Sequence, residues 1–370
     1  MIVISSSISI KRASRRQMKK LLLTVLVGAT LPAVSHAQSG VTLYGYLGGG
    51  VRWVNGLKGG SAVTFNNNIL AGNRFGIAGQ EDLGGGIKAI FKLENAFNSG
   101  TGALKNSGVL FSQAAYAGFN GDYGRLTFGR QVSSNEYVAI LLDPLEGQGQ
   151  TLAVSPTALY YFNYFTYDTR FNNTISYLGR AGGLRYGASY SPGGVAGNTR
   201  AGSNVSAMAL YQWSGGLAGF GYQKQWNAAA TQWAETFQGG GSLVLGPARL
   251  FLSYGDLHVS SATPGAPQRH DQMPGAGLVV IPTPAVQLTA AVYYDRATHM
   301  ANARQGNGHK LTTYAVAEYY LSKRTELYAE VDFDGLSGAY RSDALNIAAL
   351  GIRSGTYSTT GVSVGLMTRF

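Results

Sequence analysis

Side chains suited to acid–base chemistry or metal binding are few in this sequence. It has five histidines and no cysteine. His258, His270, His299 and His309 fall in or beside expected surface loops, far apart along the chain and without the short spacing of a metal site. No G-x-S-x-G or comparable nucleophile motif is present. The sequence therefore predicts neither an enzyme nor a metal or cofactor site.

Two acids in one long connecting segment are the more promising chemical group. Residues 132–169 contain DPLEG, with Asp143 and Glu146, directly after the apolar run Val138–Leu142. A connection of this length is usually functional. If it folds inward, the apolar run is buried and the two acids enter the interior. The alternative is an external flap that exposes the apolar run.

The N-terminus has the features of an export signal. Residues 18–37 have a basic start, an apolar stretch and a small-residue site at Ser35-His36-Ala37. We expect cleavage after Ala37, so residues 1–37 form the signal segment and 38–370 the mature chain. The preceding residues indicate an over-extended start, with Met18 as the true one. A twin-arginine signal at Arg15-Arg16 is a weaker alternative.

The charge of the mature chain is modest. Six of the 29 Lys and Arg residues lie in the signal segment and no acid does, so 23 basic residues face 18 acidic ones. Blocks of five or more basic residues are absent. Nucleic acid is therefore not an expected partner.

Composition points to contact with lipid through strands. Only 13% of the residues are charged, whereas 11% are aromatic. After the signal segment, the uncharged apolar run 277–294 is interrupted by Pro282 and Pro284. An exported chain that touches lipid without membrane helices is predicted to be a closed β-barrel.

Turn signals divide the mature chain into sixteen strands, which makes the expected fold all-β and antiparallel. Seven short Gly/Pro/Asn/Asp turns are expected near 83–86, 121–123, 179–183, 214–216, 246–247, 282–284 and 321–324. Eight longer loops are expected near 55–71, 99–110, 132–169, 192–203, 228–235, 258–270, 297–308 and 335–358. The apolar segment 345–352 competes for strand status, but the even strand number places it in the last loop.

Alternation along the strands separates a lipid face from a lumen face. An arginine turned to lipid near the midplane would cost about 2 to 4 kcal/mol, so the charged parity must face the lumen. The predicted lipid-facing residues are Val41, Leu43, Leu47, Val51 and Trp53 in the first strand, Phe171, Ile175 and Tyr177 in a middle one, and Val362, Val364, Leu366 and Phe370 in the last. The predicted lumen residues include Arg52, Arg170, Asn172, Thr174 and Ser176.

Three segments together resemble the general trimeric porins of Gram-negative outer membranes. They are GNRFGIAGQEDLGGGIKAIFKLE, YGRLTFGRQ and the terminal GVSVGLMTRF, and the similarity extends over essentially the whole mature chain. The resemblance implies a 16-stranded transmembrane β-barrel with the third loop folded into the pore. It also implies a homotrimer in the outer membrane, in contact with lipid and lipopolysaccharide.

The same resemblance assigns residues to a constriction. A basic wall would consist of Arg74 in GNRFG, Arg130 in FGRQ and Arg170 in TRFNN, facing the loop acids Asp143 and Glu146, with Glu136 a weaker candidate. In that family the terminal aromatic residue, here Phe370, is read by the outer-membrane insertion machinery.

Two departures from the family pattern bear on this assignment. Many relatives carry a further arginine where this chain has Phe111-Ser112-Gln113. Arg130 also shares parity with lipid-facing residues, and a bulge at Gly129 is expected to turn it. An arginine at the membrane interface is the alternative.

The expected function is passive diffusion of small hydrophilic solutes and ions with mild charge selection, for anions if the arginines dominate. A channel specific for sugars or organic anions is the alternative. In the aromatic tract Ala158–Tyr167, packing of the loop onto the wall or an interfacial belt is favoured over a sugar slide. An outer-membrane barrel enzyme or an adhesin is a more distant possibility.

Overall fold

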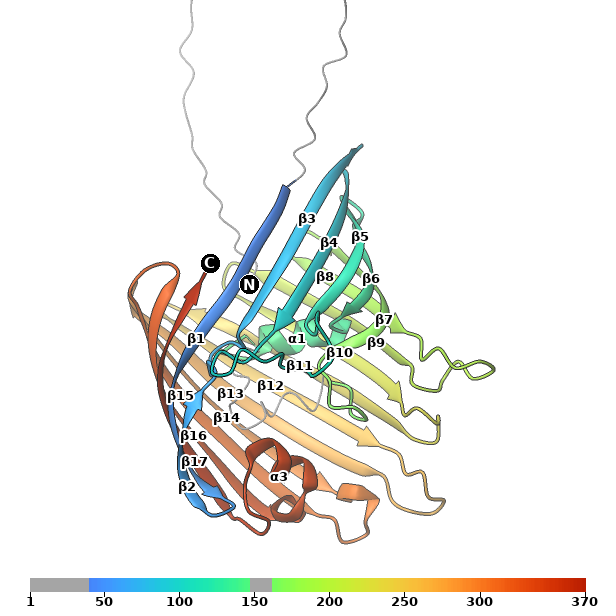
Figure 1. Ribbon diagram of the computed structural model, residues 1–370. Helices are drawn as coiled ribbons and strands as arrows, with labels where there is room; N and C mark the ends of the chain where they lie inside the picture. Colours follow the sequence, from blue (N-terminus) through green and yellow to red (C-terminus); the bar gives the residue numbers. More distant parts are fainter. Residues whose placement is uncertain (1–39, 147–161) are drawn as a thin grey trace, which may run out of the picture. The chain divides into compact units, whose positions relative to one another are not determined.

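The computed structural model describes residues 40–146 and 162–370, all within the compact unit Ala37–Phe370. The predicted signal segment lies outside the described residues. Figure 1 shows a single large sheet wound into a barrel. None of the helices in the described ranges is long and apolar enough to cross a membrane.

The strands of this sheet are all antiparallel to their neighbours. The first nine are β1 (Gly40–Leu57), β2 (Gly60–Asn66), β3 (Arg74–Gly84), β4 (Ile87–Ala96), β5 (Ala114–Gly121), β6 (Gly124–Gln131), β7 (Phe171–Ala181), β8 (Leu184–Ser191) and β9 (Asn204–Trp213). The others are β10 (Gly216–Trp226), β11 (Trp233–Leu245), β12 (Ala248–Val259), β13 (Arg269–Thr283), β14 (Val286–Thr298), β15 (Gly308–Tyr320), β16 (Thr325–Gly338) and β17 (Ser358–Arg369). The connections contain α1 (Ser134–Leu142), α3 (Ala344–Leu350) and the 3-10 turns η1 (Met300–Asn302) and η2 (Ala339–Ser342).

These strands occupy sixteen positions around a closed ring, as predicted. The first strand pairs with β17 on one side, and on the other its two halves pair with β3 and β2. The segments β2 and β3 therefore share one position. At the seam, the amide and carbonyl of Phe370 exchange hydrogen bonds of 3.1 and 3.0 Å with Gly45. Closure leaves no free edge among the described strands.

The predicted turns and loops match the observed connections, with one correction. Seven short turns alternate with eight longer connections, and the segment 345–352 contributes a helix, α3, to the last loop. A loop was expected over 55–71, but residues 60–66 within it form β2, which pairs with β1 as a hairpin. Residues 67–73 then leave the wall before β3 begins.

Alternation of exposure confirms the two faces of the barrel. Val41, Leu43 and Val51 are exposed on the outside of β1, and Val364 is exposed on β17. The prediction for Phe171 was wrong, because its side chain is 3% exposed. Asn173 has a left-handed φ of 56°, and the pairing of β6 with β7 shifts nearby, which breaks the alternation.

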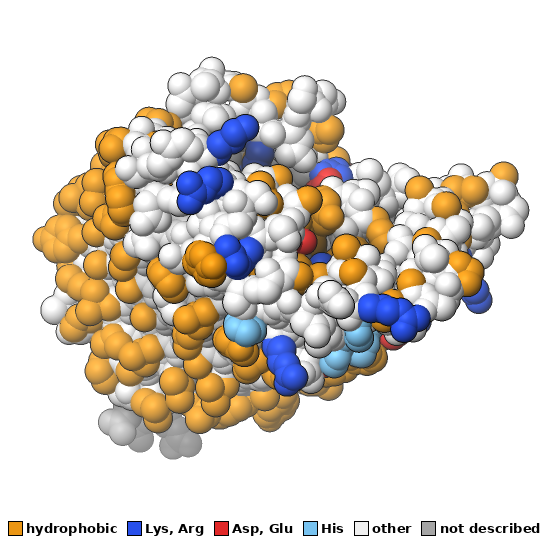
Figure 2. Space-filling view, turned by 90° about the horizontal axis from the view of Figure 1, so that it is seen from below, with side chains coloured by type: hydrophobic (Ala, Val, Ile, Leu, Met, Phe, Trp, Pro, Cys, Tyr) orange, Lys and Arg blue, Asp and Glu red, His pale blue; other side chains and the backbone are white. Residues whose placement is uncertain are grey.

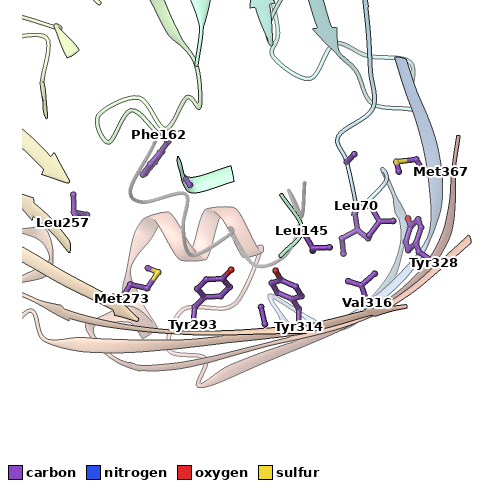
Figure 3. Close-up of a cluster of buried hydrophobic side chains, with 14 of the residues drawn as sticks. Leu70, Leu145, Phe162, Leu257, Met273, Tyr293, Tyr314, Val316, Tyr328 and Met367 are labelled. Atoms are coloured by element: carbon purple, nitrogen blue, oxygen red, sulfur yellow. The ribbon is translucent and has the colours of Figure 1, made fainter. Parts of the chain in front are cut away.

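Part of the barrel interior is filled by an apolar cluster, drawn in Figure 3. Residues 69–71, which follow β2, and parts of the third loop pack against inward-facing side chains of β13–β17. The members of this inner cluster include Leu70, Leu145, Phe162, Tyr293, Tyr314, Tyr328 and Met367. One wall of the interior is therefore covered by this cluster.

Candidate functional site

The described parts of the third loop, residues 132–146 and 162–169, lie inside the barrel and are held there by α1. The backbone amide of Ser134 donates to Ser189 Oγ and Ser206 Oγ at 3.1 and 2.9 Å, on the inward faces of β8 and β9. Gln238 Nε2 on β11 donates to the carbonyl of Asn135 at 2.8 Å. The apolar run that follows is buried against β9 and β10. The inward-folded loop is confirmed, and the external flap is excluded.

The helix α1 brings the buried carboxylate of Glu136 to Arg170, one of the three predicted arginines. Arg170 Nη1 donates to Glu136 Oε1 at 2.8 Å, and the glutamate is only 3% exposed. Burial raises the pKa of Glu136 to about 7 against the opposing effect of Arg170. Its other oxygen, Oε2, has no hydrogen-bond partner among the described residues. This carboxyl is thus poised to take up a proton near neutral pH.

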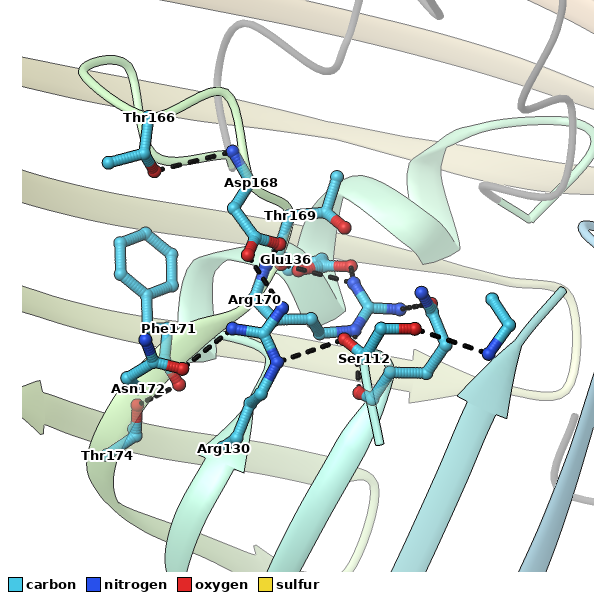
Figure 4. Close-up of polar contacts among 12 residues, drawn as sticks. Ser112, Arg130, Glu136, Thr166, Asp168, Thr169, Arg170, Phe171, Asn172 and Thr174 are labelled. Carbon is cyan, nitrogen blue, oxygen red and sulfur yellow. Dashed lines mark hydrogen bonds and ion pairs between the residues drawn. The ribbon is translucent and has the colours of Figure 1, made fainter. Parts of the chain in front are cut away.

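Arg130 joins the same network (Figure 4), and Arg74 acts on it electrostatically. Arg130 Nη2 donates to Asp168 Oδ2 at 2.6 Å, while Asp168 Oδ1 accepts from the backbone amide of Arg170 at 2.9 Å. Arg74 pairs more loosely with Glu94, at 3.5 Å. Both Arg74 and Asp168 act electrostatically on Glu136. The structure therefore brings Arg74, Arg130 and Arg170 into one cluster.

The bulge expected at Gly129 is present. Gly129 has φ of 135°, and a Cβ placed there would lie 2.2 Å from the carbonyl oxygen of Ala115. The register between β6 and β7 shifts at the next residue. Arg130 can then direct its guanidinium to Asn172 Oδ1, at 2.7 Å, and to Asp168. Only glycine fits this backbone position.

The segment Phe111-Ser112-Gln113 holds two of the predicted arginines in place. The carbonyl of Ser112 accepts from Arg130 Nε at 3.0 Å, and Gln113 accepts from Arg170 through its carbonyl and Oε1, at 2.9 and 3.1 Å. A lysine that our sequence analysis missed, Lys105, supplies charge from the same connection. Loss of hydration lowers the pKa of Lys105, and repulsion by Arg74 and Arg170 lowers it further. Because the residue is exposed, water weakens both effects.

The predicted loop acids differ in their surroundings. Asp143 is buried, and its Oδ1 accepts from the hydroxyls of Tyr293 and Tyr314, each at 2.9 Å. Glu146 is exposed and interacts electrostatically with Arg249 on β12. Asp143 therefore fixes the loop to β14 and β15, which leaves Glu146 as the loop acid that is accessible to water.

A row of acids on β16 was not among the predicted site residues. Arg52 on β1 pairs with Glu330 and Asp332 at 3.3 and 2.7 Å, and Arg369 on β17 pairs with Glu326 at 2.9 Å. The alternation in TELYAEVDFDG, which puts every acid on one face, was the available signal. Each acid of this row is buried and is paired with side chains on neighbouring strands.

The described part of the aromatic tract packs the loop to the wall. The carbonyl of Phe162 accepts from the amide groups of Gln223 and Gln225, at 3.2 and 3.1 Å. Arg269 donates to the hydroxyl of Tyr164 at 3.2 Å and lies over its ring. Residues 158–161 of this tract lie outside the described residues. The contacts seen agree with the packing interpretation.

Two histidines that are separated in sequence come together in the structure. His258 and His270 are twelve positions apart in sequence, but they lie directly opposite each other in the ladder of β12 and β13. Their rings stack with centroids 4.3 Å apart, and both contact Asp256. Strand pairing, which sequence spacing does not reveal, brings them together.

Comparison with known proteins identifies relatives over most of the chain. A family model described as Gram-negative porin matches residues 23–339. An outer membrane porin protein of Bordetella pertussis is 34% identical over 185 residues, which are 46% of this chain and 48% of that protein. This chain thus aligns with about half the length of that relative. Outer membrane porin protein 32 of Delftia acidovorans is 28% identical over 367 residues, covering 95% of this chain and all of the relative.

Among solved structures, the anion-selective porin from Comamonas acidovorans has the same fold. It superposes with a TM-score of 0.75 at 21% identity, covering 90% of this chain and 100% of that chain. The barrel fold is therefore shared with a structure of known architecture.

Proposed function

This chain belongs to the Gram-negative porin family, and from that premise we propose that its barrel is a passive diffusion channel for small hydrophilic solutes and ions, with a mild preference for anions. The protein lies in the outer membrane, as its porin relatives do. The observation that carries the proposal is a closed barrel whose third loop meets a cluster of basic side chains on the inner wall.

The anion preference rests on an excess of positive charge at this cluster. From here on, the term basic wall includes two lysines of the cluster in addition to the three predicted arginines. Its cationic members are Arg74, Lys92, Lys105, Arg130 and Arg170. Three carboxylates, Glu94, Glu136 and Asp168, accompany these five groups. The alternative, in which the loop acids dominate, is less favoured because Asp143 is buried against two tyrosines.

The size of the preference follows from Coulomb's law. A charge about 8 Å from an ion in water changes its energy by only about 0.5 kcal/mol. Selection between small anions and cations is therefore modest, and it strengthens where the lumen narrows and the local dielectric constant falls. The porin from Comamonas acidovorans is described as anion-selective, which agrees with the proposed direction of the preference.

A cavity beside the basic wall supports a water-filled path along β1, β3, β4 and β5. It has a volume of about 330 Å³. Thr42, Gln80, Lys92 and Tyr116 line it on the inner face. Ile90 and Phe91 also line this cavity, so polar and apolar side chains are mixed there.

Further parts of the proposal concern assembly. We place the protein as a homotrimer, with the exposed apolar outer face in contact with lipid and lipopolysaccharide, and we assign it no catalytic activity. Phe370 serves recognition by the insertion machinery.

Reconstitution tests the proposed function directly. In planar bilayers, the purified protein should give stepwise conductance that rises in proportion to salt concentration. In liposome swelling assays, neutral sugars should enter at rates that fall smoothly with size. Saturable uptake of a single solute, or a folded protein that does not conduct, would contradict a general diffusion channel.

A further inference from the structure

The outer face of β12 changes from apolar to polar along its length. Leu250, Leu252 and Tyr254 are exposed on the outward parity, and Asp256 and His258 continue that parity toward the connection 260–268. Aromatic side chains at such a boundary are typical of the membrane interface. The two polar residues therefore lie just beyond the apolar band, where water and ions have access.

Strand pairing completes a compact group there. His270 on β13 faces His258 across the ladder. Asp256 Oδ1 lies 2.6 Å from His258 Nε2, and Oδ2 lies 3.0 Å from His270 Nε2. One ligand atom from each residue can be chosen so that all lie within 4.8 Å of one another. Figure 2 shows exposed histidines on the face that bears the long connections.

We propose that Asp256, His258 and His270 form a binding site for a divalent transition-metal ion of the zinc class on the outer surface of the barrel. Two imidazole nitrogens and one carboxylate are a common ligand set for zinc, with a fourth position left to water. The same set suits Cu²⁺ or Ni²⁺, whereas Ca²⁺ and Mg²⁺ prefer oxygen ligands alone.

The geometry requires only a small rearrangement. Zinc takes nitrogen ligands at about 2.0 to 2.1 Å, which puts tetrahedral ligand atoms about 3.3 Å apart. The stacked rings must tilt, because a metal lies in the plane of each imidazole that binds it. The side chains of His258 and His270 are 36% and 33% exposed, so solvent-facing rotation is open to them. The metal replaces the protons that each Nε2 would otherwise share with Asp256.

Neighbouring groups orient the Asp256 carboxylate and set the charge around the site. The hydroxyl of Tyr254 donates to Asp256 Oδ2 at 3.4 Å and accepts from Gln272 Nε2 at 3.1 Å, which orients the carboxylate. On the adjacent strand β11, Glu235 lies opposite His258 and adds negative charge. Glu235 also accepts from Lys224, and Arg296 lies opposite Gln272, so the surroundings are mixed in charge.

Zinc titration of the tag-free protein in detergent tests the proposal. Calorimetry should show one zinc ion bound per chain, and His258→Ala or His270→Ala should weaken binding at least tenfold. His299→Ala and His309→Ala are matched controls that remove histidines elsewhere and should bind as the wild type does. Equal zinc binding in all four variants, or no binding by the folded wild type, overturns the site.

A second measurement does not depend on folding of the variants. Diethylpyrocarbonate modifies accessible imidazoles, and mass spectrometry reports the modified position. Zinc should protect His258 and His270 of the wild type but not His309. Equal modification of these histidines with and without zinc would also overturn the proposal.

Discussion

At the scale of single residues, the loop acids divide into an anchor and an exposed charge. Asp143 accepts two tyrosine hydroxyls, and hydrogen bonds to a charged group contribute about 1.5 to 3 kcal/mol each. We predict that Asp143→Ala releases this part of the loop and increases open-channel current noise. Single-channel recording measures that noise, and selectivity should change little.

Glu146→Gln is the control for this effect. Glu146 is exposed, so its neutralisation should raise the anion preference slightly and leave the noise unchanged. If Asp143→Ala instead shifts selectivity as Glu146→Gln does, with no added noise, Asp143 is a pore charge and the anchoring role is wrong.

Glu136 gives the channel a predicted pH dependence. The pKa of Glu136 is raised to about 7 because the group is buried, so its carboxyl gains a proton as pH falls from 8 to 6. The charge of Arg170 is then no longer balanced, and anion preference should increase. Lys105, whose pKa is lowered, gains positive charge in the same direction. Reversal potentials measured across this pH range give the test.

The variant Glu136→Gln separates the contribution of Glu136 to this pH dependence from that of Lys105. This variant should behave at pH 8 much as the wild type does at pH 6, and it should keep only the smaller change due to Lys105. A pH response of Glu136→Gln equal to that of the wild type would show that Glu136 does not titrate in this range.

The sequence motifs selected three arginines that the structure brings together, but not the partners of these arginines. The resemblance of GNRFG, FGRQ and TRFNN to porin motifs singled out Arg74, Arg130 and Arg170. The burial of Asp143 depends on tyrosines about 150 and 171 positions away, and the pairing of His258 with His270 depends on register. Neither can be read from local spacing.

At the scale of elements, turn chemistry and alternation were sufficient for most strands. Short turns such as Gly246-Pro247 marked the strand ends, and the even strand number placed 345–352 in a loop. The strand β2 was missed because it extends an existing hairpin within a long loop. Residues 69–71 fold inward because their apolar side chains find the inner cluster, a contact that only the closed barrel creates.

The closing strand carries the prediction for assembly. Deleting Phe370 removes both backbone hydrogen bonds to Gly45 and the ring that lies against it. We expect the deletion variant to accumulate as protease-sensitive, unassembled protein, because the seam between β1 and β17 is weakened. Outer-membrane fractions analysed for the heat-modifiable folded band give the measurement.

Phe370→Tyr is the matched variant, since it keeps the backbone bonds and an aromatic ring. It should assemble nearly as well as the wild type. Normal amounts of folded barrel in the deletion strain would remove Phe370 from any role in assembly.

At the scale of the whole molecule, the mature chain is predicted to begin at Gln38. The motivation is the small-residue site that ends at Ala37, after a basic and apolar segment. Intact-mass spectrometry of protein from outer membranes should give a chain that starts at Gln38. Retention of Met1 to Gln17 in that material would contradict the predicted start and cleavage.

Charge is distributed unevenly inside the barrel, and this is the basis of the proposed selectivity. The basic wall gathers five cations near three carboxylates, whereas the acids of β16 are buried in pairs with Arg52, Arg369 and Lys310. Two cations can be removed without stranding a buried acid. Glu94 keeps Lys92 at 3.0 Å when Arg74 is replaced, and Asp168 is partly exposed when Arg130 is replaced. Arg170 is retained because it balances the buried Glu136.

The reversal potential in a KCl gradient at low salt tests the central claim most directly. The wild type should favour chloride, and Arg74→Gln with Arg130→Gln should shift the potential toward potassium, because the loss of two charges changes the permeability of each ion by up to about fivefold, in opposite senses. Arg180→Ala with Arg185→Ala, a matched loss of two charges at the turn between β7 and β8, should shift it less. At 1 M salt, where the screening length is about 3 Å, both shifts should shrink. If the first double variant conducts with an unchanged reversal potential at low salt, the basic wall does not line the constriction.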